Sequence, residues 1–415
     1  MYTGVSGLQT YGNAMNVTGD NIANVNTVGF RGNRAVFADI LANQVANGAT
    51  NLQFGRGAAI SDVSASFSQG SFETTGNATD MAIQGAGFFV VRNPGFTNGT
   101  YYTRAGQFIL DQNGKLSNAN GYYVQGYQLS TNTSGAITRA SSAGDIDISG
   151  VQSVPKATST FKFGINLDAA ASAGATFATS MNVYNAVGEP VTITYTFTKS
   201  VTPLEWTFAA TGPAGTVLAG TGVNGTATFS ATGQLTQIDG GAVANQTLTI
   251  SGFPSGAQPL NTTWTLVNGV TGASLGELTS YASDSVTNSV VQDGYSTGVL
   301  RGLSVDGEGI ISGLFSNGQT QQLYQVQLAD FLSPWGLTRS GDTLFGETAQ
   351  SGQPIFGVAK AGGFGSIYGS ALEMSNVDLS EQFVTMIQNQ RAYQANSRIV
   401  TTVDQMLQEV VNLVR

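Results

Sequence analysis

The chain has 415 residues, enough for two or three domains that bury a large apolar core. Its formal net charge of −9 and its charged fraction of only 10% provide no basic patch, so we expect no nucleic-acid partner. With neither Cys nor His it lacks the thiol nucleophile, the commonest general base and the commonest metal ligand, so we expect a non-enzyme without cofactor or metal.

Residues 2–25 predict an amphipathic helix whose seam positions recur at helical spacing: Val5, Leu8, Gly12, Met15, Gly19 and Ile22. The seam glycines would let another helix approach closely, at a cost of roughly 1 kcal/mol each in helix propensity. The segment has neither the basic n-region nor the apolar h-region of a secretory signal, so we expect any export to proceed without a cleaved signal peptide. Elsewhere, too, we expect no membrane span, because every apolar run is short.

Residues 30–75 mix a short apolar patch with Gly- and Asn-rich loops, and we interpret them as a connector. The pattern then becomes β. Alternating apolar runs predict strands at 82–91, 101–110, 115–117 and 122–129, separated by turns at Asn98-Gly99, Asn113-Gly114 and Asn120-Gly121.

Residues 145–285 are rich in Thr, Ala and Gly and predict an inserted β domain. Strand candidates lie at 191–198, 206–209, 248–250 and 264–267, with turns at Asn224-Gly225 and Asp239-Gly240. The domain's aromatic side chains could stack on a ligand or form its core: Tyr195, Trp206 and Trp264. Two carboxylate pairs, Asp145 with Asp147 and Asp306 with Glu308, fall in polar turns, where we expect solvated rather than catalytic acids.

Residues 286–360 return to the first β pattern. Runs at 299–305, 310–315 and 323–331, with turns at Asp306-Gly307 and Asn317-Gly318, predict a β-meander. Residues 361–370 are Gly-rich and read as a second connector segment.

Residues 377–414 predict a long helix with a near-heptad apolar seam: Leu379, Phe383, Met386, Tyr393, Val400, Val403, Leu407, Val410 and Val414. Gln390 and Asn396 interrupt the seam. The glycines of the first helix and the length of this one favour packing between molecules, so we hypothesise that both ends order only when many copies assemble. The alternative is an ordinary bundle of the two helices within one chain.

Together these elements predict a mainly β protein with α-helical termini and nested domains. The predicted parts are a terminal helical domain (1–29 and 371–415), a connector (30–75 and 361–370), an inner β domain (76–144 and 286–360) and an inserted outer β domain (145–285). We expect the helices to form a coiled-coil-like inner layer and the two antiparallel β domains to lie outside it.

Both ends of the chain carry residues that resemble the terminal signatures of the bacterial flagellar rod and hook protein family. The N-terminal matches are Ser6-Gly7-Leu8, Asn21-Ile22-Ala23-Asn24 and Val28-Gly29-Phe30-Arg31. The C-terminal matches are Ser375-Asn376-Val377-Asp378-Leu379, Met386-Ile387, Gln390-Arg391-Ala392-Tyr393-Gln394 and Asn396. The chain resembles the hook members more than the rod members, which are generally much shorter and lack an insertion like residues 145–285. The segment Asp293-Gly294-Tyr295 also resembles the hook members.

The resemblance implies an extracellular structural subunit that self-assembles into the hook, a curved, flexible tube acting as a universal joint between rod and filament. It also implies export through the flagellar type III apparatus and contacts with the distal rod protein, the hook cap and the hook–filament junction proteins. Two alternatives stay open: a distal rod subunit, and a glycan- or surface-binding module or enzyme carried on a flagellar scaffold.

Overall fold

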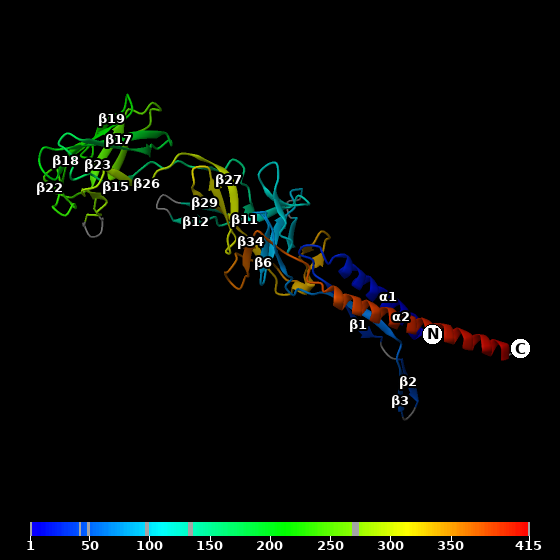
Figure 1. Ribbon diagram of the computed structural model, residues 1–415. Helices are drawn as coiled ribbons and strands as arrows, with labels where there is room; N and C mark the ends of the chain where they lie inside the picture. Colours follow the sequence, from blue (N-terminus) through cyan, green and yellow to red (C-terminus); the bar gives the residue numbers. More distant parts are fainter. Residues whose placement is uncertain are drawn as a thin grey trace. The chain divides into compact units, whose positions relative to one another are not determined.

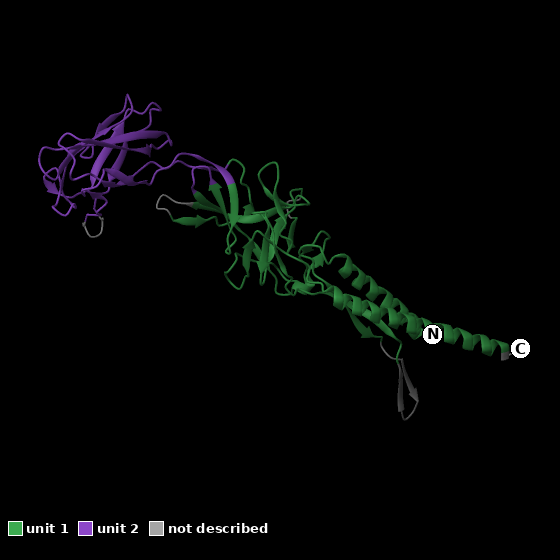
Figure 2. Ribbon diagram, viewed as in Figure 1, with its two compact units in different colours: residues 1–150, 302–314, 320–415 green, residues 151–301, 315–319 purple. Residues whose placement is uncertain are grey.

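The computed structural model describes residues 2–40, 43–47, 50–95, 99–131, 136–267 and 274–413 (Figure 1). It divides into two compact units (Figure 2): unit 1 comprises Met1–Gly150, Gly302–Leu314 and Thr320–Arg415, and unit 2 comprises Val151–Arg301 and Phe315–Gln319. The predicted seam residue Val414 and the predicted turn at Asn98-Gly99 lie outside the described residues or on their edge. The mainly β architecture with a helix at each end confirms the predicted fold class.

Unit 1 carries both terminal helices, α1 (Tyr2–Ala23) and α2 (Leu379–Leu413), within the two segments that the apolar spacing predicts. Helix α2 begins at a capping residue: Asp378 Oδ1 accepts hydrogen bonds from the backbone N–H of Ser380 at 2.7 Å and of Glu381 at 3.3 Å. An acid at this position also interacts favourably with the helix dipole. In the described part of the chain, neither helix is long and apolar enough to cross a membrane.

After α1 the chain forms antiparallel strands where the sequence predicted only a loop-rich connector. Strand β1 (Asn33–Asp39) pairs with β4 (Ala58–Ala65), and β2 (Asn43–Asn47) pairs with β3 (Thr50–Phe54). The ladder is attached to α1, because Thr10 Oγ1 donates a 2.8 Å hydrogen bond to the carbonyl of Ala58 and the rings of Tyr11 and Phe37 are 5.5 Å apart.

The β part of unit 1 contains one large sheet and two small ladders. The central order runs β27-β28-β29-β11-β7-β8-β32-β31, and β27, β28 and β29 form the predicted meander. The ladders pair β34 with β6 and β35 with β5. The strands and one short helix are β5 (Phe72–Thr74), β6 (Met81–Gln84), β7 (Phe88–Arg92), β8 (Thr100–Thr103), β9 (Phe108–Leu110), β10 (Leu116–Asn118), β11 (Tyr123–Thr131), β12 (Ile137–Arg139), β13 (Gly144–Asp145), β27 (Gly298–Val305), β28 (Ile310–Phe315), β29 (Thr320–Val326), β30 (Leu328–Asp330), η1 (Pro334–Gly336), β31 (Thr338–Arg339), β32 (Leu344–Gly346), β33 (Ile355–Gly357), β34 (Ser366–Gly369) and β35 (Ala371–Glu373).

Several predicted strands of this part are wrong in extent. Residues 82–91 form two strands, β6 and β7, rather than one, because Gly85 and Gly87 adopt φ values of +102° and +122°. Such angles are open to glycine and break an extended run. The segment 101–110 is likewise divided between β8 and β9.

Unit 2 is a sandwich of two antiparallel-rich sheets around one aromatic core. One sheet has the order β19-β23-β24-β15-β25 with β26 beside β15, and the other has the order β16-β17-β18-β20-β21-β22. Side chains that point into the core alternate with side chains that point outward, as along β17. The ring centroids of Trp264 in one sheet and Phe208 in the other are 5.4 Å apart. The strands are β14 (Gln152–Ser153), β15 (Thr160–Asn166), β16 (Thr176–Tyr184), β17 (Pro190–Lys199), β18 (Glu205–Thr211), β19 (Val217–Ala219), β20 (Asn224–Phe229), β21 (Leu235–Ile238), β22 (Gly241–Ala242), β23 (Gln246–Ser251), β24 (Leu260–Trp264), β25 (Leu278–Thr279) and β26 (Val286–Gln292).

The predicted turn at Asn224-Gly225 is wrong, because both residues belong to β20. Gly225 is needed for a close contact instead: a Cβ placed on it would lie 2.5 Å from Asp239 Oδ1, which accepts a 2.7 Å hydrogen bond from Thr226 N–H. The predicted turn at Asp239-Gly240 is confirmed, with φ values of +50° and +75°.

Candidate functional site: the terminal helix pair and its junction

The two terminal helices lie side by side and antiparallel (Figure 1). Gly7, near the start of α1, packs against Asn396 of α2. Asn21, near the end of α1, contacts α2 at Gln382, where Asn21 Nδ2 donates to Gln382 Oε1 at 3.0 Å. The buried positions of α1 are all small or neutral and polar: Gly4, Gly7, Thr10, Ala14, Thr18 and Asn21. The contact within the subunit therefore buries little apolar surface.

The glycines that permit the close approach are not the predicted ones. A Cβ on Gly7 would lie 2.6 Å from Asn396 Oδ1, and one on Gly4 would lie 3.1 Å from Val400 Cγ2. Around Gly12 and Gly19 the space is open to 4 Å, so the predicted helix approach at these two positions does not occur within the subunit. The helices meet along the stripe with the smallest side chains, which lies on a different face of α1 from the apolar seam.

The predicted apolar seams stay largely uncovered in the subunit. On α2, Phe383 and Leu407 are each 51% exposed. The other exposed seam residues are Val5, Leu379, Tyr393 and Val410, and the half-buried ones are Leu8, Met15, Ile22, Met386, Val400 and Val403. Since no described seam residue is fully buried, the apolar stripes are not the core of a bundle within the chain.

Two amide side chains of the predicted signature connect the helices to the connector. Asn21 Nδ2 donates to the carbonyl of Asn33 at 2.7 Å, and Asn21 Oδ1 accepts from Asn33 N–H at 2.7 Å. Asn376 Oδ1 accepts from Gly32 N–H at 2.8 Å, and its Nδ2 donates to the carbonyl of Ser66 at 2.9 Å. Asn21 thus fixes the end of α1 to β1, and Asn376 fixes the segment before α2 to the residues that flank β1 and β4. By contrast, the signature residues Gln390 and Arg391 are exposed on α2.

A buried carboxylate lies next to this junction. Glu373, which is 0% exposed, accepts from Arg31 Nη2 at 2.9 Å and from Arg104 Nη1 at 3.2 Å. It also accepts from Gln69 Nε2 at 2.8 Å and from Gly70 N–H at 2.9 Å. Burial lowers the pKa of Arg104 to about 10, which keeps the guanidinium charged at neutral pH. A single carboxylate thus holds two buried cations from distant parts of the chain.

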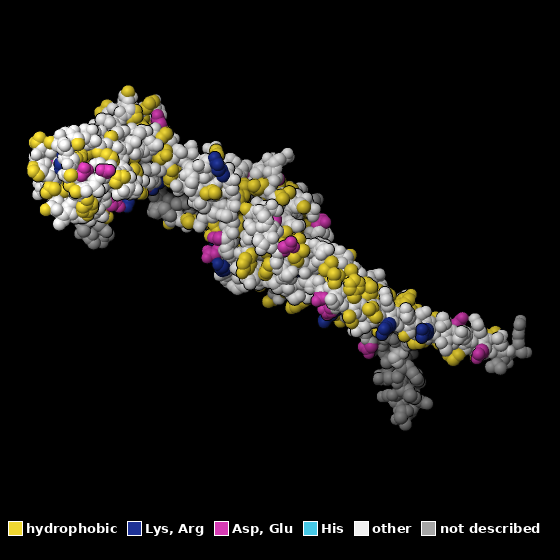
Figure 3. Space-filling model, viewed as in Figure 1, with side chains coloured by type: hydrophobic (Ala, Val, Ile, Leu, Met, Phe, Trp, Pro, Cys, Tyr) yellow, Lys and Arg dark blue, Asp and Glu magenta, His cyan; other side chains and the backbone are white. Residues whose placement is uncertain are grey.

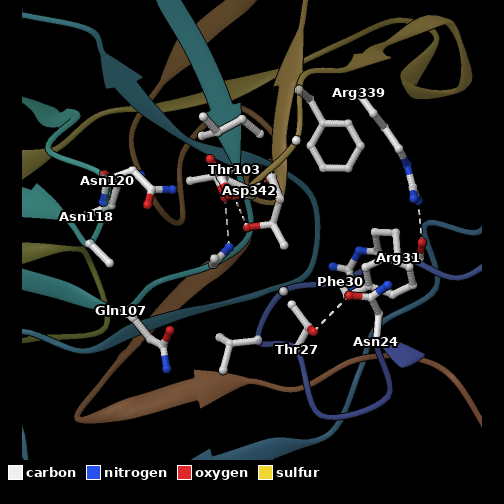
Figure 4. Close-up of a pocket in the computed structure, with 18 of the residues that line it drawn as sticks. Asn24, Thr27, Phe30, Arg31, Thr103, Gln107, Asn118, Asn120, Arg339 and Asp342 are labelled. Atoms are coloured by element: carbon white, nitrogen blue, oxygen red, sulfur yellow. Dashed lines mark hydrogen bonds between the residues drawn. The ribbon is translucent and has the colours of Figure 1, made fainter. Parts of the chain in front are cut away.

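The signature residues Gly29, Phe30 and Asn24 line a cavity of about 470 Å³ beside the junction (Figure 4). Gly29 has φ +69°, and a Cβ there would lie 2.4 Å from Ala105 N. Phe30 is buried, and the guanidinium carbon of Arg339 lies 5.2 Å from the centre of the Phe30 ring. Arg339 also donates a hydrogen bond to the backbone carbonyl of Arg31. Asn24 Oδ1 accepts from Thr27 Oγ1 at 3.1 Å. The matched residues therefore form one packed corner where α1 meets the β part.

One acid of each carboxylate pair makes contacts that stabilise the local structure. Asp145 is bound by Arg92 Nη2 at 2.6 Å and by Lys115 Nζ at 3.1 Å, so the prediction that it is merely solvated is wrong. Burial alone would raise the pKa of Asp145, but hydrogen bonds from Arg92 and Gln125 outweigh burial and lower it. Asp306 Oδ1 accepts from two backbone N–H groups of its own turn. Among the residues placed by the structure, no cluster of three or more potential metal ligands occurs.

The aromatic side chains of the insertion are not a ligand platform. Trp206 is 1% exposed and both Tyr195 and Trp264 are 0% exposed, and all three belong to the core of the sandwich. The glycan-binding alternative therefore loses the residues on which it was based.

Four family models match successive parts of the chain. They are described as "Flagella basal body rod protein" (residues 1–31), "Flagellar hook protein FlgE/F/G D1 domain" (82–164), "Flagellar basal body protein FlaE D2 domain" (153–295) and "Flagellar basal body rod FlgEFG protein C-terminal" (369–413). The terminal matches coincide with the helix pair and its junction.

Curated relatives extend the likeness to the whole chain. The flagellar hook protein FlgE of Borreliella burgdorferi is 35% identical, over 100% of this chain and 99% of its own. Those of Treponema pallidum and Escherichia coli are 32% and 33% identical, over 100% and 99% of this chain and 99% and 98% of their own. With exposed helical seams, matched signatures at both ends and full-length identity of this order, the chain belongs to the flagellar hook protein family.

Proposed function

We propose that this chain is a structural subunit that self-assembles into the flagellar hook, a curved and flexible tube between the rod and the filament. The observation that carries the proposal is the exposure of the apolar seams in the folded subunit, since Phe383 and Leu407 face solvent although they follow a coiled-coil period. Sister copies supply the missing apolar surface.

The energetics favour assembly over a stable lone helix pair. Within the subunit the helices meet where Gly4 faces Val400, Gly7 faces Asn396 and Asn21 bonds Gln382, so little apolar area is removed from water there. Burying one large apolar seam side chain is worth roughly 1.5–3 kcal/mol. Packing many copies recovers that free energy at every seam position, which offsets the cost of ordering the two ends. The order of the ends in a lone subunit stays a prediction.

The β parts of the subunit suit contacts that shift as the tube bends. Charged side chains are sparse on the visible surface (Figure 3), in keeping with a charged fraction of 10%. Small neutral surfaces lack the strong ion pairs that would lock one arrangement. We assign the helix pair to the inner wall of the tube and the inner (76–144 and 286–360) and inserted (145–285) β domains to its outside.

The remaining assignments follow from family membership. We propose an extracellular position in the hook, reached through the flagellar type III export apparatus without a cleaved signal peptide. The proposed partners are the same chain, the distal rod protein, the hook cap and the hook–filament junction proteins. The proposed role is mechanical and not catalytic.

Assembly of purified full-length chain tests the proposal. Negative-stain images at increasing protein concentration should show hollow tubes, and amide exchange in residues 2–23 and 379–413 should slow on assembly. Curved tubes support a hook subunit, and straight, stiff tubes support a distal rod subunit. Protein that stays monomeric at every concentration, even with added tube fragments as seeds, contradicts both.

A further inference from the structure

Helix α2 is longer than α1 and extends beyond it. It has 35 residues and α1 has 22, which correspond to about 53 Å and about 33 Å at 1.5 Å per residue. Near the start of α1, Gly4 lies against Val400, and beyond Val403 all side chains from 404 to 412 are exposed. We name residues 404–412 the overhang. It has no partner among the described residues of its own chain.

The overhang carries a single apolar stripe. Met406, Leu407, Val410 and Val411 are spaced by three and four residues, which places them on one face of the helix, and each is more than half exposed. Gln405 lies on the opposite face. A stripe of this kind in water is unfavourable unless another surface covers it.

A groove of about 840 Å³ lies at the other end of the same helix pair. Its walls come from α1, β1, the loop with η1 and the first turns of α2. Two large aromatic side chains on these walls are exposed, Phe37 at 44% and Trp335 at 68%, and Val17 and Val377 add half-buried apolar surface. Among the described residues, the walls carry one cation, Arg34, and two acids, Asp378 and Glu381, so apolar contact rather than charge would hold the overhang there.

We propose that the overhang of one subunit docks in this groove of the next subunit along the tube. An unpartnered apolar stripe at one end of a helix pair and an aromatic-lined groove at the other form a head-to-tail contact, which repeats without closing on itself. This inference rests on the proposed function and names the surfaces that meet.

The size of the contact explains why it would operate only in the assembly. Stable pairs bury about 1,200–2,000 Å² in total, more than four overhang side chains can provide. The contact is therefore weak between two free subunits and gains strength when lateral seams hold many copies in register.

The chain has no native cysteine, so disulfide cross-linking reports this contact without background. Two double variants place a cysteine on each surface: Val410→Cys with Trp335→Cys, and Leu407→Cys with Phe37→Cys. The matched control is Gln405→Cys with Trp335→Cys, because Gln405 points away from the stripe. Each variant is oxidised mildly as assembled tubes and as dilute monomer, and peptide mass spectrometry identifies the joined positions.

We expect covalent ladders joining an overhang position to a groove position in the tubes, loss of these ladders in dilute monomer, and no ladder in the control. Tubes that form without overhang-to-groove links, or that link position 410 only to position 410 of another copy, overturn this inference and leave the proposed function standing. If the cysteine-free parent forms no tubes, the proposed function fails and the inference fails with it.

Discussion

The side chain of Asn396 packs against Gly7 so closely that a Cβ on residue 7 would lie 2.6 Å from Asn396 Oδ1. Asn396 is also held by its own helix, with Nδ2 donating to the carbonyl of Ala392 at 2.9 Å. Asn396, which interrupts the predicted apolar seam of α2, is thus the residue against which α1 packs. Substitutions at Gly7 and at Gly12 can therefore test whether the two helices meet at Gly7.

Gly12→Ala should stabilise α1 by about 0.8–1 kcal/mol through helix propensity, because the space around residue 12 is open. Gly7→Ala should lose this gain, since the added methyl group must displace Asn396. Circular dichroism during thermal unfolding of the two variants measures the difference. Equal stabilisation would show that the helices do not meet at Gly7 in solution.

The same position offers a test of the outer face of α1. Gly12→Leu leaves the folded subunit intact because nothing lies within 4 Å of residue 12. If a sister helix crosses there, as the seam spacing predicts, this variant forms fewer or shorter tubes in electron micrographs. Normal tubes would restrict close helix contacts to the Gly4 and Gly7 face.

Phe383→Asp or Leu407→Asp should abolish tube formation and leave both β parts folded, because each places a charge on the exposed seam that we propose sister copies cover. Gln394→Asp, on an exposed position outside the seam, is the control. Assembly is followed by electron microscopy, and folding of unit 2 by fluorescence of the buried Trp206 and Trp264. Normal tubes from either seam variant would argue against the seam.

Glu373→Gln should destabilise unit 1 strongly. It removes the carboxylate shared by Arg31 and Arg104 and leaves two buried guanidinium groups without a counter-charge, a loss of roughly 3–5 kcal/mol. Glu277→Gln breaks the more exposed pair with Lys162 and should cost less than about 1 kcal/mol. Urea unfolding followed by circular dichroism compares them, and similar losses would refute a special role for Glu373.

Acid should weaken unit 2 through Asp293. Burial alone would raise its pKa, but hydrogen bonds from Ser159, Thr160 and Lys156 outweigh burial and lower the pKa to about 2. A carboxylate with a lowered folded pKa stabilises the fold above its unfolded pKa of about 3.9, and the effect disappears as pH falls from about 4 to about 2. Tryptophan fluorescence during urea unfolding at several pH values should show this loss, and Asp293→Asn should reduce its slope.

Local periodicity was enough to predict both terminal helices and most strands. The exposed seam positions were also predictable, because apolar spacing at Phe383 and Leu407 is a property of a few consecutive turns. The buried face of α1 was not, since close helix packing selects the smallest side chains, and Gly7 carries no hydropathy signal. The Asn-Gly rule failed at Asn224, where the glycine that follows makes room for Asp239 in the turn between β21 and β22.

The junction at Glu373 was beyond local reasoning for a different reason. Its partners Arg31 and Arg104 are separated from it by hundreds of residues, and only the folded chain brings them together. One weak signal existed: Glu373 directly follows Ala371 and Leu372 in a short apolar run, where an acid is unusual.

Helix α1 precedes every described strand and α2 follows them all, so the contact between the helices joins residues far apart in the sequence, such as Asn21 and Gln382. Contacts between residues so distant in the sequence form slowly, because the loss of chain entropy comes before the contact is made. We therefore expect the β parts to fold first and the two helices to pair last.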